Sequence, residues 1–223
     1  MNFILDNFIP APALDAPAQG DALCRLCAED KGGCCRTDPQ RTYLSFPLSL
    51  PEWRRLVPYR HLATVSPPAD TESFAREEER ISPESAPLQD MAAPPPGGDA
   101  LCAEEENRPD FISSMCALFT GQKKRIMTLF PVNGRHLSLR TRSDGSCAFL
   151  GSSGCRLPRS ARPWYCLLFP AWLIGGSLTL FSSTDCLIFQ KAYGPAHGIA
   201  LLRSTSATVR MQHSALRKDW GLE

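Results

Sequence analysis

Ten cysteines in a chain of 223 residues are the feature that most constrains how this protein folds. Eight of them form two groups, one near each end of the chain: Cys24, Cys27, Cys34 and Cys35, then Cys147, Cys155, Cys166 and Cys186. Neither group has the repeated C-x2-C layout of a self-contained zinc finger. We therefore expect the two groups to complete each other in the folded protein.

The cellular compartment decides how the cysteines are interpreted. Secreted proteins use them as disulfide staples, whereas the reducing cytosol favours metal binding or thiol chemistry. Residues 1–20 contain Asp6 and Asp15 and no positively charged region, so the sequence predicts no signal peptide. We expect a cytoplasmic protein with reduced thiols, and a disulfide-held structural protein is the alternative.

The charge balance and the apolar segments indicate which partners to exclude. The chain has 24 basic and 23 acidic side chains, which gives no electrostatic reason to expect nucleic acid or an anionic membrane. Trp164–Phe181 carries no charge and approaches the ~18 residues of a membrane span. Pro170 and Gly175-Gly176 interrupt it, so a β-hairpin over 171–181 is the better interpretation.

The composition changes between residues 63 and 109, where prolines and acidic residues are dense. Low hydrophobicity with high charge cannot bury enough surface to offset the entropy of ordering. The sequence therefore predicts a disordered insertion at 63–109 inside one cysteine-cluster metal-binding domain, 21–223. Residues 1–20 are expected to be a loosely ordered N-terminus.

Local patterns predict an α+β fold. Ser49-Leu50-Pro51-Glu52 has the form of a capping box and predicts a helix at about 50–57. Apolar residues share one helical face over 109–119, and Asn133-Gly134 predicts a hairpin within 125–142. Further predicted elements are a strand at 41–46 and helical segments at 199–202 and 209–220. We expect a small irregular domain organised by its metal, with short antiparallel hairpins and a few helices.

The ligand chemistry follows from the residue types. A C-x2-C spacing, as at Cys24 and Cys27, lets two thiolates reach one ion. Thiolate selects zinc, iron–sulfur clusters or copper(I) over magnesium and calcium. The four histidines lie outside both groups, so we expect an all-cysteine shell. Eight thiols could fill two four-coordinate sites, or one site with redox-active spares.

Four of the cysteines need separate treatment. Neighbouring side chains of an extended chain point to opposite faces, so Cys34 and Cys35 reach one ion only if the chain turns sharply. Otherwise one of the two is a ligand. Cys102 falls in the predicted insertion, and Cys116 lies beside the apolar face of its helix. Neither of these last two is a ligand candidate.

Cys166 follows a predicted helix start. Ser160 could cap a helix that Pro163 helps to begin, which would place Cys166 one turn inside it. The helix dipole and nearby arginines would then lower the pKa of the thiol.

The motifs D-G-S-C-A-F-L (144–150) and R-P-W-Y-C-L-L-F-P (162–170), together with Cys155 and the first cysteine group, resemble the YkgJ-type cysteine-cluster family. These CxxCxxCC proteins are described as zinc- or iron-chelating domains. The resemblance covers about residues 24–57 and 144–190. It implies a cofactor of Zn²⁺ or Fe, with a [4Fe–4S] cluster as one form of the iron.

Two functions are consistent with these features. The first is a metal-binding protein that chelates zinc or iron through the eight cysteines of the two groups. The alternative is an iron–sulfur-dependent enzyme, because a related cluster occurs in flagellin lysine-N-methylase. No catalytic residue is assigned, since the sequence shows no glycine-rich cofactor loop and no C-x3-C-x2-C run.

Overall fold

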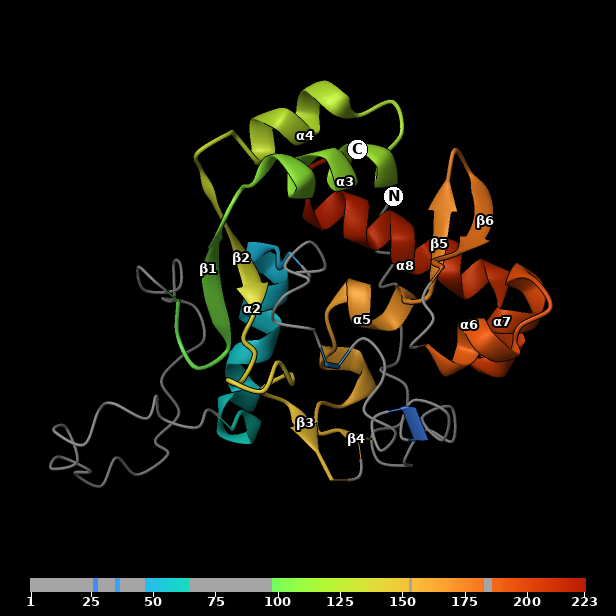
Figure 1. The fold of residues 1–223 in the computed structure, drawn as a ribbon, viewed down its shortest axis with the longest axis horizontal. Coiled ribbons are helices and arrows are strands. Elements are labelled where there is room, and N and C mark those ends of the chain that lie inside the picture. The colour runs from blue at the N-terminus through green and yellow to red at the C-terminus, as the bar shows by residue number, and fades with distance from the viewer. Residues whose placement is uncertain (1–25, 28–34, 37–46, 65–97, 153, 183–185) are drawn as a thin grey trace, which may run out of the picture.

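The computed structural model describes residues 26–27, 35–36, 47–64, 98–152, 154–182 and 186–223 (Figure 1). These residues form helices and short two-stranded antiparallel sheets, which confirms the predicted α+β class. The predicted strand at 41–46 lies outside the described residues.

Helix α2 (Leu50–Leu56) begins at the predicted capping box. The Glu52 backbone N–H donates to Ser49 Oγ at 3.3 Å, and Glu52 Oε2 accepts from the Ser49 backbone N–H at 2.9 Å. The chain then continues as the 3₁₀-helix η2 (Val57–Leu62). Pro58 has no N–H to donate, so the α-helical hydrogen-bond pattern stops at this point.

Strand β1 (Cys102–Glu106) pairs with β2 (Arg135–Leu139), and Cys102 lies opposite Leu139. The prediction of a disordered insertion at 63–109 is therefore wrong at both described ends, 63–64 and 98–109, while 65–97 lie outside the described residues. The acidic run at the end of β1 is partly exposed, and Glu106 lies at the surface. Glu104 lies 3.5 Å from the Arg135 guanidinium, so β2 supplies opposite charge.

The predicted hairpin at 125–142 is wrong in its first half. Helix α4 (Lys123–Leu129) occupies it, with Ile126 and Phe130 buried one helical turn apart. Asn133 has a φ of 65° and does form a turn with Gly134, but that turn connects α4 to β2. Apolar residues four positions apart lie on one face of a helix as readily as on one face of a strand, so the pattern does not distinguish the two. The strand that pairs with β2 comes instead from a distant segment.

Several other predictions are confirmed. Helix α3 spans Pro109–Leu118. Strands β5 (Ala171–Ile174) and β6 (Ser177–Leu180) form the expected hairpin, in which Gly175 and Gly176 both have positive φ. The remaining elements are β3 (Leu150–Gly151), β4 (Gly154–Cys155), η3 (Arg159–Ala161), α5 (Trp164–Leu168), α6 (Leu187–Lys191), α7 (Pro195–Leu201) and α8 (Ser206–Asp219).

Two clusters of buried apolar side chains stabilise the described structure. One surrounds Trp172 and draws on α3, α4, α5, β5 and α8. The other surrounds Trp53 and includes Leu101 and Phe149, with Cys147 and Cys155 packed against it. Helix α5 lies in the middle of the molecule, between α2 and the α6–α7 pair (Figure 1). The segments that carry Cys147 and Cys155 thus lie beside the Trp53 cluster, while the α5 residues Tyr165 and Leu168 belong to the Trp172 cluster.

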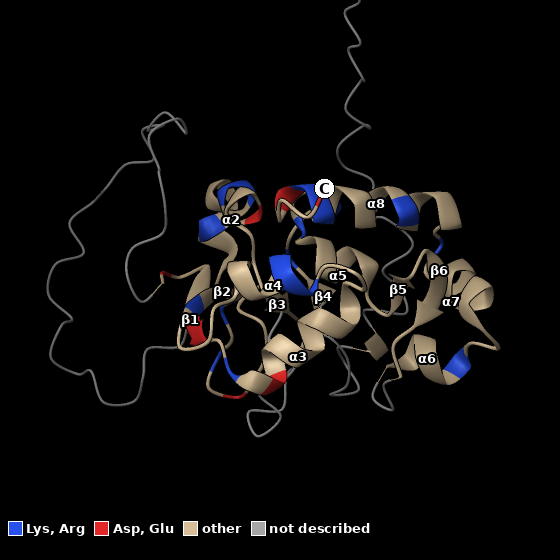
Figure 2. Ribbon diagram, turned by 90° about the horizontal axis from the view of Figure 1, so that it is seen from above, with Lys and Arg blue, Asp and Glu red and all other residues tan. Residues whose placement is uncertain are grey.

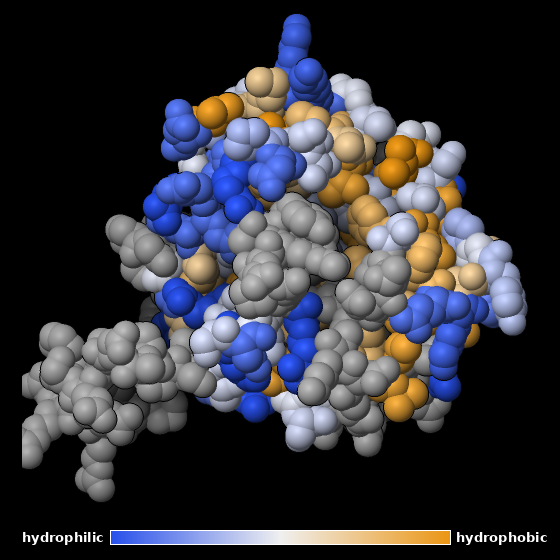
Figure 3. Space-filling model, viewed as in Figure 1, coloured by the Kyte–Doolittle hydropathy of each residue, from blue (hydrophilic) through white to orange (hydrophobic). Residues whose placement is uncertain are grey.

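The described surface mixes its charges and shows apolar side chains on one side. Basic and acidic residues occur on the same elements, as on α2 and at the end of α8 (Figure 2). Figure 3 shows apolar side chains toward the side that carries the β5–β6 hairpin, where Ile174 is exposed. No helix among the described residues is long and apolar enough to cross a membrane.

Candidate metal centre

The structure describes six of the eight predicted ligands: Cys27, Cys35, Cys147, Cys155, Cys166 and Cys186. Cys24 and Cys34 lie outside the described residues. The six come from separate segments of the chain, so their placement depends on how those segments are held together.

The loop that carries Cys147 is built by local hydrogen bonds. The Asp144 carboxylate accepts from the backbone N–H of Ser146 at 2.9 Å, and Gly145 has a φ of 76° that makes the turn. The Arg142 guanidinium donates to the Leu150 carbonyl at 2.6 Å, so it closes the two ends of the loop on each other. Cys147 is thereby held in one backbone position.

Cys35 lies beside this loop. The backbone N–H of Cys147 donates to the Cys35 carbonyl at 2.8 Å, and Arg36 forms a β-bridge with Ser146. The backbone therefore brings a member of the N-terminal cysteine group next to the C-terminal group.

Cys155 reaches the same region through a short strand pair. The Leu150 N–H donates to the Cys147 carbonyl at 2.9 Å, and Leu150 then pairs with Cys155 across the β3–β4 ladder. Gly154 takes a φ of 102°, which lets the chain reverse within so few residues. Cys147 and Cys155 are thus linked through Leu150.

Cys166 is the third residue of α5, and Glu52 holds the start of this helix. The Trp164 backbone N–H donates to Glu52 Oε1 at 2.7 Å. Ser160 belongs to η3 instead, so the expectation that it caps the helix of Cys166 is wrong. The Glu52 carboxyl takes the capping role because α2 places it directly at the first turn of α5.

The thiols of these segments interact electrostatically. Burial raises the pKa of Cys166 well above its ordinary value, and the neighbouring Cys147, Cys35 and Cys155 raise it further. Burial likewise raises the pKa of Cys147 to about 12, with added contributions from Cys35 and Cys155. We call Cys35, Cys147, Cys155 and Cys166 the four-thiol group. The expected lowering of the Cys166 pKa is wrong, because burial outweighs the helix dipole and the arginines.

Cys186 and Cys27 form a second association, the Cys27–Cys186 pair. Cys186 is buried at the start of α6, and its pKa is raised by burial first and then by Cys27. The backbone N–H groups of Ile188 and Phe189 donate to its sulfur, as the N–H of Phe149 does to Cys147. Such hydrogen bonds stabilise a thiolate, which is the form that binds metal.

The described side chains are not arranged as a finished coordination shell. No three His, Cys, Asp or Glu side chains in the described part of the chain are grouped so that they could hold a metal ion. In the four-thiol group the backbone segments lie close together, but the side chains would have to reorient to share one ion.

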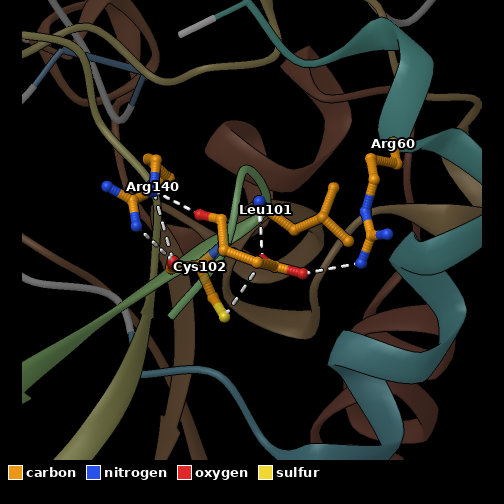
Figure 4. Close-up of polar contacts among 5 residues, drawn as sticks. Arg60, Leu101, Cys102 and Arg140 are labelled. Carbon is orange, nitrogen blue, oxygen red and sulfur yellow. Dashed lines mark hydrogen bonds and ion pairs between the residues drawn. The ribbon is translucent and has the colours of Figure 1, made fainter. Parts of the chain in front are cut away.

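Cys102 is held within the fold by polar contacts, which Figure 4 shows. It is fully buried in the Trp53 cluster instead of lying in a disordered insertion. Its Sγ lies 3.4 Å from Asp99 Oδ1, and Asp99 also accepts from Arg60 at 2.8 Å. Arg140 donates to the Cys102 carbonyl at 3.0 Å. Burial first, and then Asp99, raise the pKa of Cys102 to about 12.

Alkylation of the native protein is expected to leave Cys102 unmodified while Cys116 reacts. Cys102 is buried and protonated at neutral pH, whereas Cys116 is partly exposed on α3. Mass spectrometry of the digested protein after a brief iodoacetamide pulse measures both sites. Equal labelling of the two would contradict the buried position of Cys102, and full labelling in denaturant is the control.

The histidines that the structure buries belong to the core. His136 stacks on Phe111 with ring centroids 4.0 Å apart and is hydrogen-bonded to Asn107 at 2.8 Å. His213 packs edge-on against Trp172 at 5.0 Å. Burial lowers the pKa of both histidines to about 4. Both are neutral at pH 7.

Sequence reasoning missed Glu52 and Arg142 as parts of this region. Glu52 was identified only as half of a capping box, because a local motif contains no information about Trp164, which lies far along the chain. Arg142 gave no signal, since an isolated arginine in a turn is common. Asp144 could have been found, because Asp-Gly before a cysteine predicts a tight turn.

Comparison of the chain with protein-family models, curated proteins and solved structures gives no match. The resemblance to the YkgJ-type cysteine-cluster proteins therefore stays a prediction, and it rests on the cysteine motifs alone.

Proposed function

We propose that this chain is a metal-binding protein that chelates zinc or iron through cysteine thiolates, with the four-thiol group as its centre. The observation that supports this most directly is the backbone hydrogen bond between Cys147 and Cys35. It places cysteines from the two ends of the chain side by side, as a shared centre requires. Cys155 and Cys166 lie close enough to these two cysteines for the thiols to interact electrostatically.

The chemistry of these residues fits a thiophilic metal. Four sulfur donors in a partly buried site match structural zinc and iron–sulfur centres, and they do not match hard cations. Neutral thiols that lie close together stabilise one another only weakly. A bound cation would displace their protons and replace mutual repulsion between thiolates with attraction to the metal.

A metal centre also explains why eight of the ten cysteines fall into two groups in a protein expected to remain in the cytoplasm. The described core around Trp53 is small, and the loops that carry Cys147 and Cys155 have little regular structure. In such domains the free energy of metal binding contributes directly to the free energy of folding. The Cys27–Cys186 pair would add ligands for a second ion.

Elemental analysis with a visible absorption spectrum, on protein purified without oxygen, tests this proposal. Iron with sulfide and a broad band near ~400 nm would identify an iron–sulfur cluster. Colourless protein with one or two zinc ions per chain would identify zinc. Metal-free protein that takes up neither zinc nor iron, although all of its thiols are reduced, would contradict the proposed function.

A further inference from the structure

The Glu52 carboxylate lies between the first turns of two helices, α2 and α5. It is 1% exposed. Its Oε2 accepts from Ser49 Oγ at 2.6 Å and from the Ser49 N–H at 2.9 Å, and its Oε1 accepts from the Trp164 N–H at 2.7 Å. Each oxygen of one side chain therefore serves a different helix.

A capping box alone does not require this arrangement. Capping glutamates function at exposed helix ends, whereas burial of a carboxylate is unfavourable unless several donors surround it. In this protein burial raises the pKa of Glu52, and three donors oppose that rise; the third is the Trp164 N–H, which comes from the helix that carries Cys166. The buried position of Glu52 therefore connects α2 to α5.

Trp164 is held at its side chain as well as at its backbone. Its indole N–H donates to Asp219 Oδ2 at 2.7 Å, and the same Asp219 oxygen accepts from Arg55 of α2 at 2.9 Å. The Arg55 guanidinium also lies over the indole ring, 4.7 Å from its centroid. Residues of α2 and α8 thus fix the first residue of α5, two positions before Cys166.

We propose that Glu52 is a positioning residue, which sets the place of the Cys166 thiol in the four-thiol group by anchoring the first turn of α5. That Glu52 places a metal ligand rests on the proposed metal-binding function. That Glu52 anchors α5 does not depend on that function. Helix α5 has five residues and cannot hold its own geometry without tertiary contacts. Loss of the Glu52 acceptor would free its first turn.

Glu52→Met tests the role, because methionine fills similar space and accepts no strong hydrogen bond. Thr205→Ala is the matched control, since it removes the side-chain cap of another helix, α8, and touches neither Glu52 nor Trp164. In metal-free protein, we expect Glu52→Met to raise the exchange rate of the Trp164 amide and the alkylation rate of Cys166 at least about tenfold. Thr205→Ala should leave both rates near those of the wild type.

The metal readout uses Co²⁺ and Zn²⁺ as probes. Glu52→Met should weaken Co²⁺ binding at least about tenfold, as loss of a supporting residue does in other metal sites. It should also change the visible spectrum of the Co²⁺ protein, whereas Thr205→Ala should leave both unchanged. Wild-type affinity and spectrum in Glu52→Met, with unchanged exchange and alkylation, would overturn the positioning role.

The two proposals can fail separately. Faster exchange and alkylation in Glu52→Met, with no Co²⁺, Zn²⁺ or iron bound even by the wild type, would support the anchor and refute the metal centre. If Glu52→Met does not fold, Glu52→Asp replaces it, because a carboxylate shorter by one methylene cannot reach both Ser49 and Trp164. An unchanged Trp164 exchange rate in Glu52→Asp would overturn the anchor.

Discussion

Cys166→Ser is expected to lose nearly all of the metal bound at the four-thiol group, whereas Cys116→Ser keeps the wild-type content. A serine hydroxyl is a poor ligand for zinc or iron, and a centre with three of its four sulfurs binds metal far more weakly. Cys116 lies on α3 and packs against the Trp172 cluster, so its replacement leaves the site unaltered. Elemental analysis of the purified variants gives the metal content.

The same variants report on stability. Ligand binding energy is folding energy in small metal domains, where apparent values reach about 10–16 kcal/mol for structural zinc. We expect Cys166→Ser to unfold at clearly lower denaturant concentration than Cys116→Ser. A full metal complement in Cys166→Ser would refute its assignment as a ligand.

Cys186→Ser separates the two thiol associations. Cys186 has Cys27 as its thiol neighbour, while Cys166 has the other three members of the four-thiol group. We therefore expect Cys186→Ser to retain the metal held by that group. Complete loss of metal from Cys186→Ser would show that the pair and the group form a single centre.

Acidification from pH 7 to about pH 4 is expected to destabilise the protein by several kcal/mol, and His213→Phe should reduce this loss. Burial lowers the folded-state pKa of His213 and of His136 to about 4, below the value near ~6.5 of an unfolded histidine. Between these two values the unfolded chain binds the proton and the folded chain does not. Stability is therefore full above about pH 6.5 and falls as the pH drops toward 4.

The size of the effect follows from the shift. A difference of about 2.5 pKa units corresponds to an upper limit of about 3 kcal/mol for each histidine. Urea unfolding of the wild type and of His213→Phe at pH 7 and pH 4.5 measures it, since phenylalanine keeps the contact with Trp172 and cannot be protonated. His61→Gln, at an exposed position, is the control. An equal loss of stability in wild type and His213→Phe would contradict the prediction.

The parts of the fold that depend on local chemistry could be predicted from the sequence. The capping box at Ser49 and Glu52 produced α2, and the two glycines between β5 and β6 produced that hairpin. These signals work because the turn or cap is formed by residues next to one another. The predictions for 98–109 and for the first half of 125–142 failed, since β2 pairs with β1 across α3 and α4 and not with the segment just before it.

For the site, the sequence alone determined which residues can act as soft ligands and that they fall into two groups. Only the tertiary structure decided that Cys35 lies against Cys147 and that Cys186 lies with Cys27. It also decided that Cys147, Cys166 and Cys186 carry raised pKa values, because burial is a property of the packed chain. The hydrogen bond from the Trp164 N–H to Glu52 likewise could not be predicted from the sequence. A carboxylate can satisfy a nearby cap and a distant helix together, and the distant partner is known only once the chain has folded.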